Sequence, residues 1–163
     1  MSRTGRRMHF ALDHRAEPDP AFVPPSLRLA EPSDAPSGER RNRYARWALH
    51  ERLGEGDVVA LLMRNQPDVL AIWQGLGSVG VTVMPLDLTL RGTALARSLD
   101  AIGPRHLFVD AGLAETLCSV QGLVSVQPLV WWHGGADFAR IDLEIAEYDD
   151  APLAPQALPA RRA

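Results

Sequence analysis

The chain has 163 residues, which suits one domain, and its 46% hydrophobic and 23% charged residues are typical of a globular protein. Its net charge of -3 gives no general attraction for nucleic acid, and its single cysteine, Cys118, excludes an internal disulfide and a cysteine-based zinc cluster. No run approaches the ~18 apolar residues of a membrane helix, and no secretory signal is recognisable, so we expect a cytoplasmic protein, with peripheral membrane contact left open.

The first part of the chain divides into an irregular segment and a helix. Residues 1–38 are rich in proline and turn-forming residues, so we expect irregular chain there. Residues 39–53 predict a helix with Tyr44, Trp47 and Ala48 on one face, ended by Gly54. Its other side, typical of a solvated helix face with a phosphate-binding stripe as the alternative, carries Arg40, Arg41, Arg43, Arg46 and Arg52.

Strand and helix patterns then alternate. Residues 57–63 form an apolar run that suits a buried strand, and 81–86 predict a second strand. Between them, Asn65 or Gln66 can cap a helix with Pro67 in its first turn. Its apolar positions recur at helical spacing, at Val69, Ile72, Trp73, Leu76 and Val79.

The alternation continues beyond the second strand. Thr93 is the expected cap of a helix with Leu95, Leu99 and Ile102 on one side and a stop at Gly103. Further along, 106–109 predict a third strand, Asp110 caps a helix through Cys118, and 128–132 predict a fourth strand with Trp131 and Trp132 on opposite faces.

The last part of the chain has weaker patterns. Residues 138–148 predict a weak helix or irregular segment, and a disordered, linker-like tail is expected from Asp150 to the end at 163. Strands that alternate with helices of about three turns indicate βαβ units and an α/β fold with a parallel sheet and right-handed crossovers.

The glycines of GLGSVG, residues 75–80, match the pattern G-x-G-x-x-G. In a dinucleotide site such glycines follow a strand and open a helix, whereas here they close a helix and precede a strand. The pattern therefore indicates packing: Gly75 and Gly77 are expected to let the helix approach the sheet, and Gly80 to end it.

Other chemically active residue types give no catalytic pattern. Cys118 is expected to be a small core residue, Ser98 and Ser119 lack the context of a nucleophile, and Asp87 is expected in a turn or cap. The histidines have no metal-ligand spacing and no clustered acidic partners, which indicates surface or satisfied polar positions for His9, His14, His50, His106 and His133.

Several stretches, in order and spacing, resemble one family. They are RYARWAL at 43–49, GDVVALLMRNQPDVLAIWQGL from Gly56, the Gly80 to Pro85-Leu86-Asp87 spacing, LRGTALARSLDAIGPRHLFVD at 90–110, and VWWHGGADFARIDLEI with APLAP behind it. Together, from about Asn42 to about Leu153, they resemble the large domain of the AMP-dependent synthetases/ligases, the adenylate-forming acyl-CoA synthetases. The long- and very-long-chain fatty-acid–CoA ligases and fatty-acid transport proteins form the most similar branch.

This resemblance implies a partial AMP-binding-enzyme-like α/β domain at 39–149, with an incomplete parallel sheet and flanking helices. It implies fatty acid, ATP, Mg and CoA as ligands of the intact family, which forms an acyl-adenylate and then an acyl-CoA. The matched residues are scaffold, so no catalytic, cofactor-binding or metal residue is assigned to this chain.

The departures from the family lead to two hypotheses. The family's Thr/Ser/Gly-rich loop ending in lysine does not follow Leu153, and LAEPSDAPSGERRN replaces the expected start. We therefore expect a fragment that is inactive alone, truncated before the ATP loop and altered near its start, as a frame shift would produce. The alternative is a non-catalytic module that docks through an exposed sheet edge onto a partner such as an intact synthetase.

Overall fold

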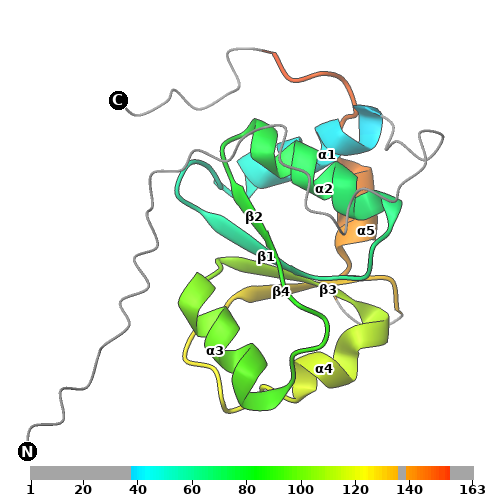
Figure 1. Cartoon of the computed structure of the whole chain (residues 1–163). Helices are drawn as coiled ribbons and strands as arrows, with labels where there is room; N and C mark the ends of the chain where they lie inside the picture. Colours follow the sequence, from blue (N-terminus) through cyan, green and yellow to red (C-terminus); the bar gives the residue numbers. More distant parts are fainter. Residues whose placement is uncertain (1–37, 136–138, 155–163) are drawn as a thin grey trace, which may run out of the picture.

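A parallel β-sheet with helices on both faces forms the centre of the protein (Figure 1). The computed structural model describes residues 38–135 and 139–154. The four strands lie in the order β2-β1-β3-β4, and every neighbouring pair is parallel. Their bounds are β1 Val58–Leu62, β2 Thr82–Pro85, β3 His106–Asp110 and β4 Leu129–His133. The predicted parallel α/β sheet is confirmed.

Helices connect successive strands, as parallel pairing requires. Helix α2 (Pro67–Ser78) joins β1 to β2, and α3 (Gly92–Ile102) carries the chain back across β1 to β3. A 3-10 turn, η3 (Ala111–Leu113), and the short α4 (Ala114–Cys118) lead from β3 to β4. Because β2 and β3 lie on opposite sides of β1, the strand order reverses between β1 and β3.

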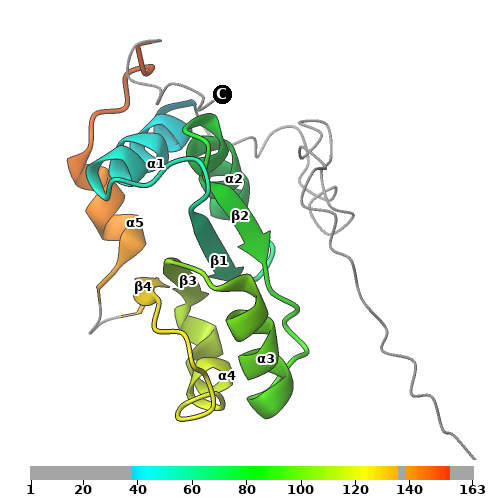
Figure 2. The same ribbon diagram turned by 90° about the vertical axis from the view of Figure 1, so that its left-hand side faces the viewer.

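The helices form two layers, which the orthogonal view separates clearly (Figure 2). Helices α1 (Gly38–His50) and α2 lie on one side with α5 (Ile141–Glu144) and η4 (Ile145–Glu147), and α3 and α4 lie on the other. Alternate strand residues enter opposite cores: Leu61 packs towards α1 and α2, whereas Leu62 packs towards α3. Trp131 and Trp132 likewise pack into different cores, as predicted.

An aromatic cluster centred on Trp47 fills the core under α1. The Trp47 ring is fully buried and lies 5.2 Å from Phe108, 5.2 Å from His106 and 5.7 Å from Trp131, edge-on to each. Trp131 Nε1 donates a hydrogen bond to His106 Nδ1 over 3.1 Å. Burial lowers the pKa of His106, so the predicted satisfied polar histidine is a neutral hydrogen-bond acceptor in the core.

Two of the predicted helix ends are wrong, because backbone hydrogen bonds and conformation, and not the residues that usually cap or end a helix, set these ends. Helix α1 ends at His50 rather than Leu53; Arg52 adopts φ 56° and Leu53 N donates back to Ala48 O over 2.8 Å. This is a Schellman-type end without glycine. Helix α3 begins at Gly92 after Arg91, so Thr93 lies inside the helix and is not its cap.

Other predicted ends are confirmed. Pro67 is the first residue of α2, although Gln66 makes no side-chain capping bond. Gly103 ends α3 in the left-handed conformation, with φ 59°. The Asp110 side chain accepts a hydrogen bond from Gly112 N over 2.9 Å and so caps η3, which leads into α4.

The three glycines near the end of α2 have different roles, and one of them, Gly75, serves helix–helix packing. A Cβ at Gly75 would lie 2.5 Å from Arg41 O and 2.8 Å from Tyr44 Cβ, so this glycine lets α2 approach α1. At Gly77 a Cβ would meet nothing within 4 Å. The expected approach to the sheet is therefore wrong for both, whereas Gly80, with φ 88°, does form the turn after the helix.

The segment after η4 lies against α1. Asn42 Nδ2 donates to Asp150 O over 2.8 Å, Arg43 forms an ion pair with Asp150 at 3.0 Å, and Arg46 donates to Ala151 O over 3.1 Å. The expectation of a disordered tail is thus wrong for 150–154, and part of the arginine side of α1 binds this segment instead of facing only solvent. Expectations for 1–37 and 155–163 lie outside the described residues.

Within the described ranges, no helix combines the length and apolar character needed to cross a membrane.

Candidate functional site

Polar side chains gather at the carboxyl edge of the sheet, the edge at which open parallel sheets bind ligands. Arg64, Gln66 and Asp68 follow β1, Asp110 ends β3 and His133 ends β4. Because the strands are parallel, residues far apart in the sequence meet here.

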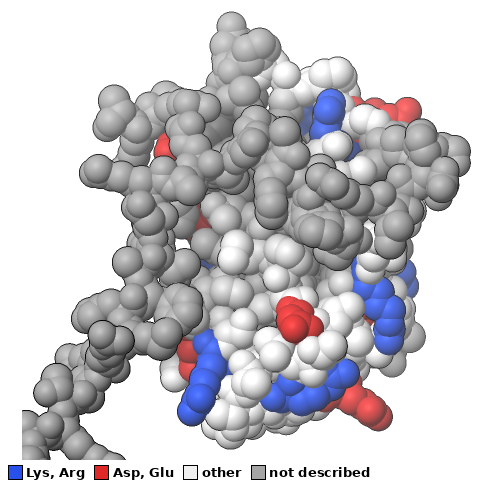
Figure 3. Space-filling model, in the orientation of Figure 1, with Lys and Arg blue, Asp and Glu red and all other residues white. Residues whose placement is uncertain are grey.

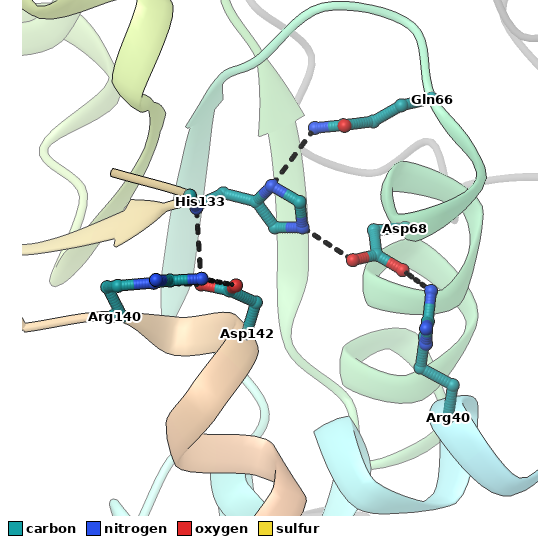
Figure 4. Close-up of polar contacts among 7 residues, drawn as sticks. Arg40, Gln66, Asp68, His133, Arg140 and Asp142 are labelled. Carbon is teal, nitrogen blue, oxygen red and sulfur yellow. Dashed lines mark hydrogen bonds and ion pairs between the residues drawn. The ribbon is translucent and has the colours of Figure 1, made fainter. Parts of the chain in front are cut away.

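His133 lies at the centre of the cluster (Figure 4). Its Nε2 is 2.5 Å from Asp68 Oδ2, and its Nδ1 is 3.5 Å from Gln66 Nε2. The other oxygen of Asp68 pairs with Arg40 of α1. One carboxylate at the start of α2 therefore joins β4 to α1.

A second carboxylate, Asp142 of α5, completes the cluster beside His133. Asp142 pairs with Arg140 and accepts a hydrogen bond from Gly134 N over 3.2 Å. Arg140 Nη1 also donates to Gly135 O over 2.8 Å. Gly134 and Gly135 both have positive φ, 76° and 86°, so the predicted tight turn after His133 is present.

These contacts shift the proton affinities in opposite directions. The hydrogen bond with the Asp68 carboxylate raises the pKa of His133 against the effect of burial, and the charges of Asp142 and Asp110 add to this. Burial would raise the pKa of Asp68, but His133 and Arg40 outweigh it and lower that pKa. The pKa of Asp142 is lowered, against burial, by Arg140 and Gly134. An ionised carboxylate and a protonated imidazole favour each other here.

Arg64 spans the point where the strand order reverses between β1 and β3. Its Nη1 lies 3.1 Å from Asp110 Oδ2, and its Nη2 donates to Gly112 O over 3.3 Å. A Cβ at Gly112 would be 2.5 Å from Arg64 Nη1, so the guanidinium lies directly over this glycine. The position at which α/β folds often bind a ligand is thus covered by the chain's own arginine.

The arrangement suits structural cross-linking better than nucleotide chemistry. A triphosphate needs free cations and converging backbone N–H groups, but the guanidinium groups of Arg40, Arg64 and Arg140 each contact a carboxylate. In the described part of the chain no three His, Cys, Asp or Glu side chains are placed to hold a metal ion. These residues do not fit the ATP and Mg that the family resemblance implies.

The structure corrects two sequence-based interpretations of candidate residues. His133 does have acidic partners, Asp68 and Asp142, which the sequence pattern missed because Asp68 is 65 residues away. Cys118 is exposed and not a core residue; Thr116, which is 4% exposed, is buried on that helix instead.

Two other candidates have structural partners. The Asp87 carboxylate accepts from Thr89 N over 2.8 Å and from Thr89 Oγ1 over 2.7 Å, which confirms its turn role. Ser119 Oγ accepts from Gly92 N and donates to Thr116 O, so it joins α4 to the start of α3. His9 and His14 lie outside the described residues.

Replacing Asp68 with asparagine tests the cross-linking role. The variant keeps the shape but removes the negative charge from Arg40 and His133, so we expect a loss of about 1.5–3 kcal/mol of unfolding free energy at pH 6. Urea unfolding measures this, with Asp87→Asn as the exposed control. Equal stability of the two variants would contradict a structural role for the cluster.

Sequence comparison gives the family. The pattern described as "AMP-binding enzyme" matches residues 38–160. The chain belongs to the AMP-binding enzyme family. It is 38% identical over 94 residues to human long-chain fatty acid transport protein 6, and 30% identical over 115 residues to bovine long-chain fatty acid transport protein 1. These matches cover 57% and 65% of this chain but 15% and 18% of those proteins.

Solved structures show the same fold. The anthranilate CoA ligase AuaEII, in complex with anthranoyl-AMP, aligns with a TM-score of 0.64 at 16% identity, over 73% of this chain and 23% of that one. A fatty acyl CoA synthetase of Mycobacterium tuberculosis aligns with a TM-score of 0.57 at 20% identity, over 71% and 23%. The sheet and helices of this family member therefore have the adenylate-forming fold. The chain spans less than a quarter of either of these two enzyme chains.

Proposed function

We propose that this chain is scaffold of an ATP-dependent fatty-acid–CoA ligase. The observation that carries the proposal is the family match over 38–160, together with 38% identity over 94 residues to a long-chain fatty acid transport protein. The whole ligase would activate a fatty acid with ATP, release pyrophosphate and transfer the acyl group to CoA. A cytoplasmic location with peripheral membrane contact is part of this proposal.

We propose further that this chain supplies no catalytic group. Adenylation needs cations that offset phosphate charge, and the sequence contains no lysine at all. The arginines at the carboxyl edge are paired with carboxylates across the strand ends. The ligase chemistry would then depend on residues outside this chain.

Pyrophosphate release tests the proposal. The purified 163-residue chain is mixed with ATP, Mg²⁺, CoA and fatty acids of several chain lengths, beside an active ligase of the family as a positive control. We expect no turnover above background. Turnover that co-purifies with the chain and disappears in a Trp47→Ala variant would show that the chain holds a complete site.

Exposed sheet edges favour a second candidate, a non-catalytic module that docks onto an intact synthetase of the same family. Edge strands β2 and β4 carry exposed apolar residues, with Met84 at 40% and Leu129 at 58% exposure. The outer edge of β4 is paired at Trp132 with the chain at 139–140. Among the described residues β2 pairs with β1 alone, and an open strand edge invites partners. Sedimentation of the chain with and without an intact fatty-acid–CoA ligase decides: a shift in the ligase peak supports docking, and independent sedimentation excludes it at the concentrations used.

A further inference from the structure

The His133 cluster lies where the sheet leads into the last helical segment of the described chain. On one side are β4 and the start of α2, and on the other are Asp142 and Arg140 at the start of α5 (Figure 4). We propose that His133 is a pH-sensitive clasp. Its ring fixes the turn after β4 to the start of α2, and the backbone of that turn, at Gly134 and Gly135, binds Asp142 and Arg140. The segment 139–150 is thereby held more tightly in mildly acidic solution than above neutral pH.

Other contacts also hold this segment, so the clasp is expected to change how readily the segment opens locally and not whether the sheet folds. Trp132 N donates to Ala139 O over 2.8 Å, and Ile141 and Ile145 enter the core beneath α1. At its far end, Asp150 contacts Asn42 and Arg43. Leu143, between these anchors, is 57% exposed. A short helix with one apolar face is expected to open locally before the sheet does.

The ring of His133 can remain hydrogen-bonded in either protonation state. In the neutral ring, Nε2–H donates to Asp68 and Nδ1 accepts from the Gln66 amide. In the charged ring both nitrogens donate, and rotation of the Gln66 amide presents its oxygen to Nδ1. Protonation therefore keeps the geometry and converts a neutral hydrogen bond to Asp68 into a charge-assisted one.

Charges from every neighbouring element face this ring. Carboxylates come from Asp68 of α2, Asp142 of α5 and Asp110 of β3. The compensating guanidinium groups come from Arg40 of α1, Arg64 after β1 and Arg140 before α5. Each guanidinium contacts its own carboxylate. The His133 ring contacts Asp68 directly, and the backbone N–H of the next residue, Gly134, donates to Asp142.

The direction of the pH effect follows from the two shifts. Because the pKa of His133 is raised on folding, its stabilisation is full below about pH 6.5 and is lost as the pH rises through the folded value. Because the pKa of Asp68 is lowered, its stabilisation is present above about pH 4 and is lost on acidification. The clasp is tightest between about pH 4 and 6.5.

Hydrogen exchange on the full chain, corrected for intrinsic rates, tests the clasp. Amides of 141–148 should be more protected at pH 6 than at pH 8, by up to about tenfold for each unit by which folding raises the pKa of His133. The variant His133→Gln should lose this difference. His50 is the matched control, because its ring lies 5.7 Å from Tyr148 at the end of the same segment; His50→Gln should keep the difference.

A second measurement uses the unmodified chain, so it does not depend on whether the variant folds. The NMR titration of His133 in the unmodified chain should give a pKa above 6.5, with the Gln66 side-chain amide shifting in parallel. A pKa at or below 6.5, or an unchanged pH dependence in His133→Gln, would overturn the proposal.

Discussion

Replacing Trp47 with alanine is expected to cost about 3–5 kcal/mol of unfolding free energy, the largest effect of any single change considered. The indole is fully buried, and the rings of His106, Phe108 and Trp131 contact it edge-on. Its removal is therefore expected to leave a cavity between these rings. Among the described residues, no hydrogen-bond partner faces the indole Nε1, so we attribute the expected loss to packing. Urea denaturation followed by far-UV circular dichroism measures it.

Trp73→Ala is the matched control, because it removes the same side chain from a partly buried position on α2. We expect it to cost less than half as much, since less apolar area leaves the core. If the two variants melt at the same urea concentration, the core is not centred on Trp47.

Replacing Gly75 with alanine should give the second largest loss, about 2–3 kcal/mol. The new methyl group would lie 2.5 Å from Arg41 O, a backbone atom of α1 that cannot rotate away. Helices α1 and α2 would have to move apart, and this would also weaken the Arg40–Asp68 ion pair between them.

The neighbouring Gly77→Ala variant is the control, since a Cβ there meets nothing within 4 Å. Alanine at an exposed helical position should stabilise by up to about 1 kcal/mol relative to glycine. Opposite signs for two glycines two residues apart are expected in thermal unfolding. Equal destabilisation would show that the glycines act through chain flexibility and not through the α1–α2 contact.

The strands and helices were predictable because their signals are local. The apolar runs that become β1 and β3 are buried on both faces, so they read as nearly continuous Val, Leu and Phe, and helical spacing in α2 required no knowledge of its partner. The opposite placement of Trp131 and Trp132 follows from the two-residue period of a strand.

The wrong predictions concern residues whose surroundings are set by contacts with distant parts of the chain. Gly75 faces α1 and not the sheet, because the sequence pattern gives an apolar face without naming its partner. Asp150 binds Arg43, 107 residues earlier, and the proline-rich sequence from Asp150 onward gives no sign of this contact. The pair of Asp68 and His133 forms only because α2 begins beside the end of β4 at the carboxyl edge. Side-chain spacing along the chain carries no signal for such pairs.

The arginines at the carboxyl edge of the sheet pair with carboxylates of the same chain. They are therefore not free to bind the phosphates of a nucleotide. On the described part of the face in Figure 3, arginine and acidic side chains form a few separate patches among uncharged residues. We therefore propose that the chain is a folded scaffold and that the nucleotide chemistry of its family depends on residues outside this chain.

Titration of the ¹⁵N-labelled chain with ATP and Mg²⁺, followed by amide chemical shifts, tests this claim most directly. We predict no saturable shift at Arg64, Asp110 or His133 and their neighbours up to millimolar nucleotide, while the spectrum remains that of a folded protein. Saturable shifts at these three strand ends would show that the edge opens to receive ATP and would contradict the account.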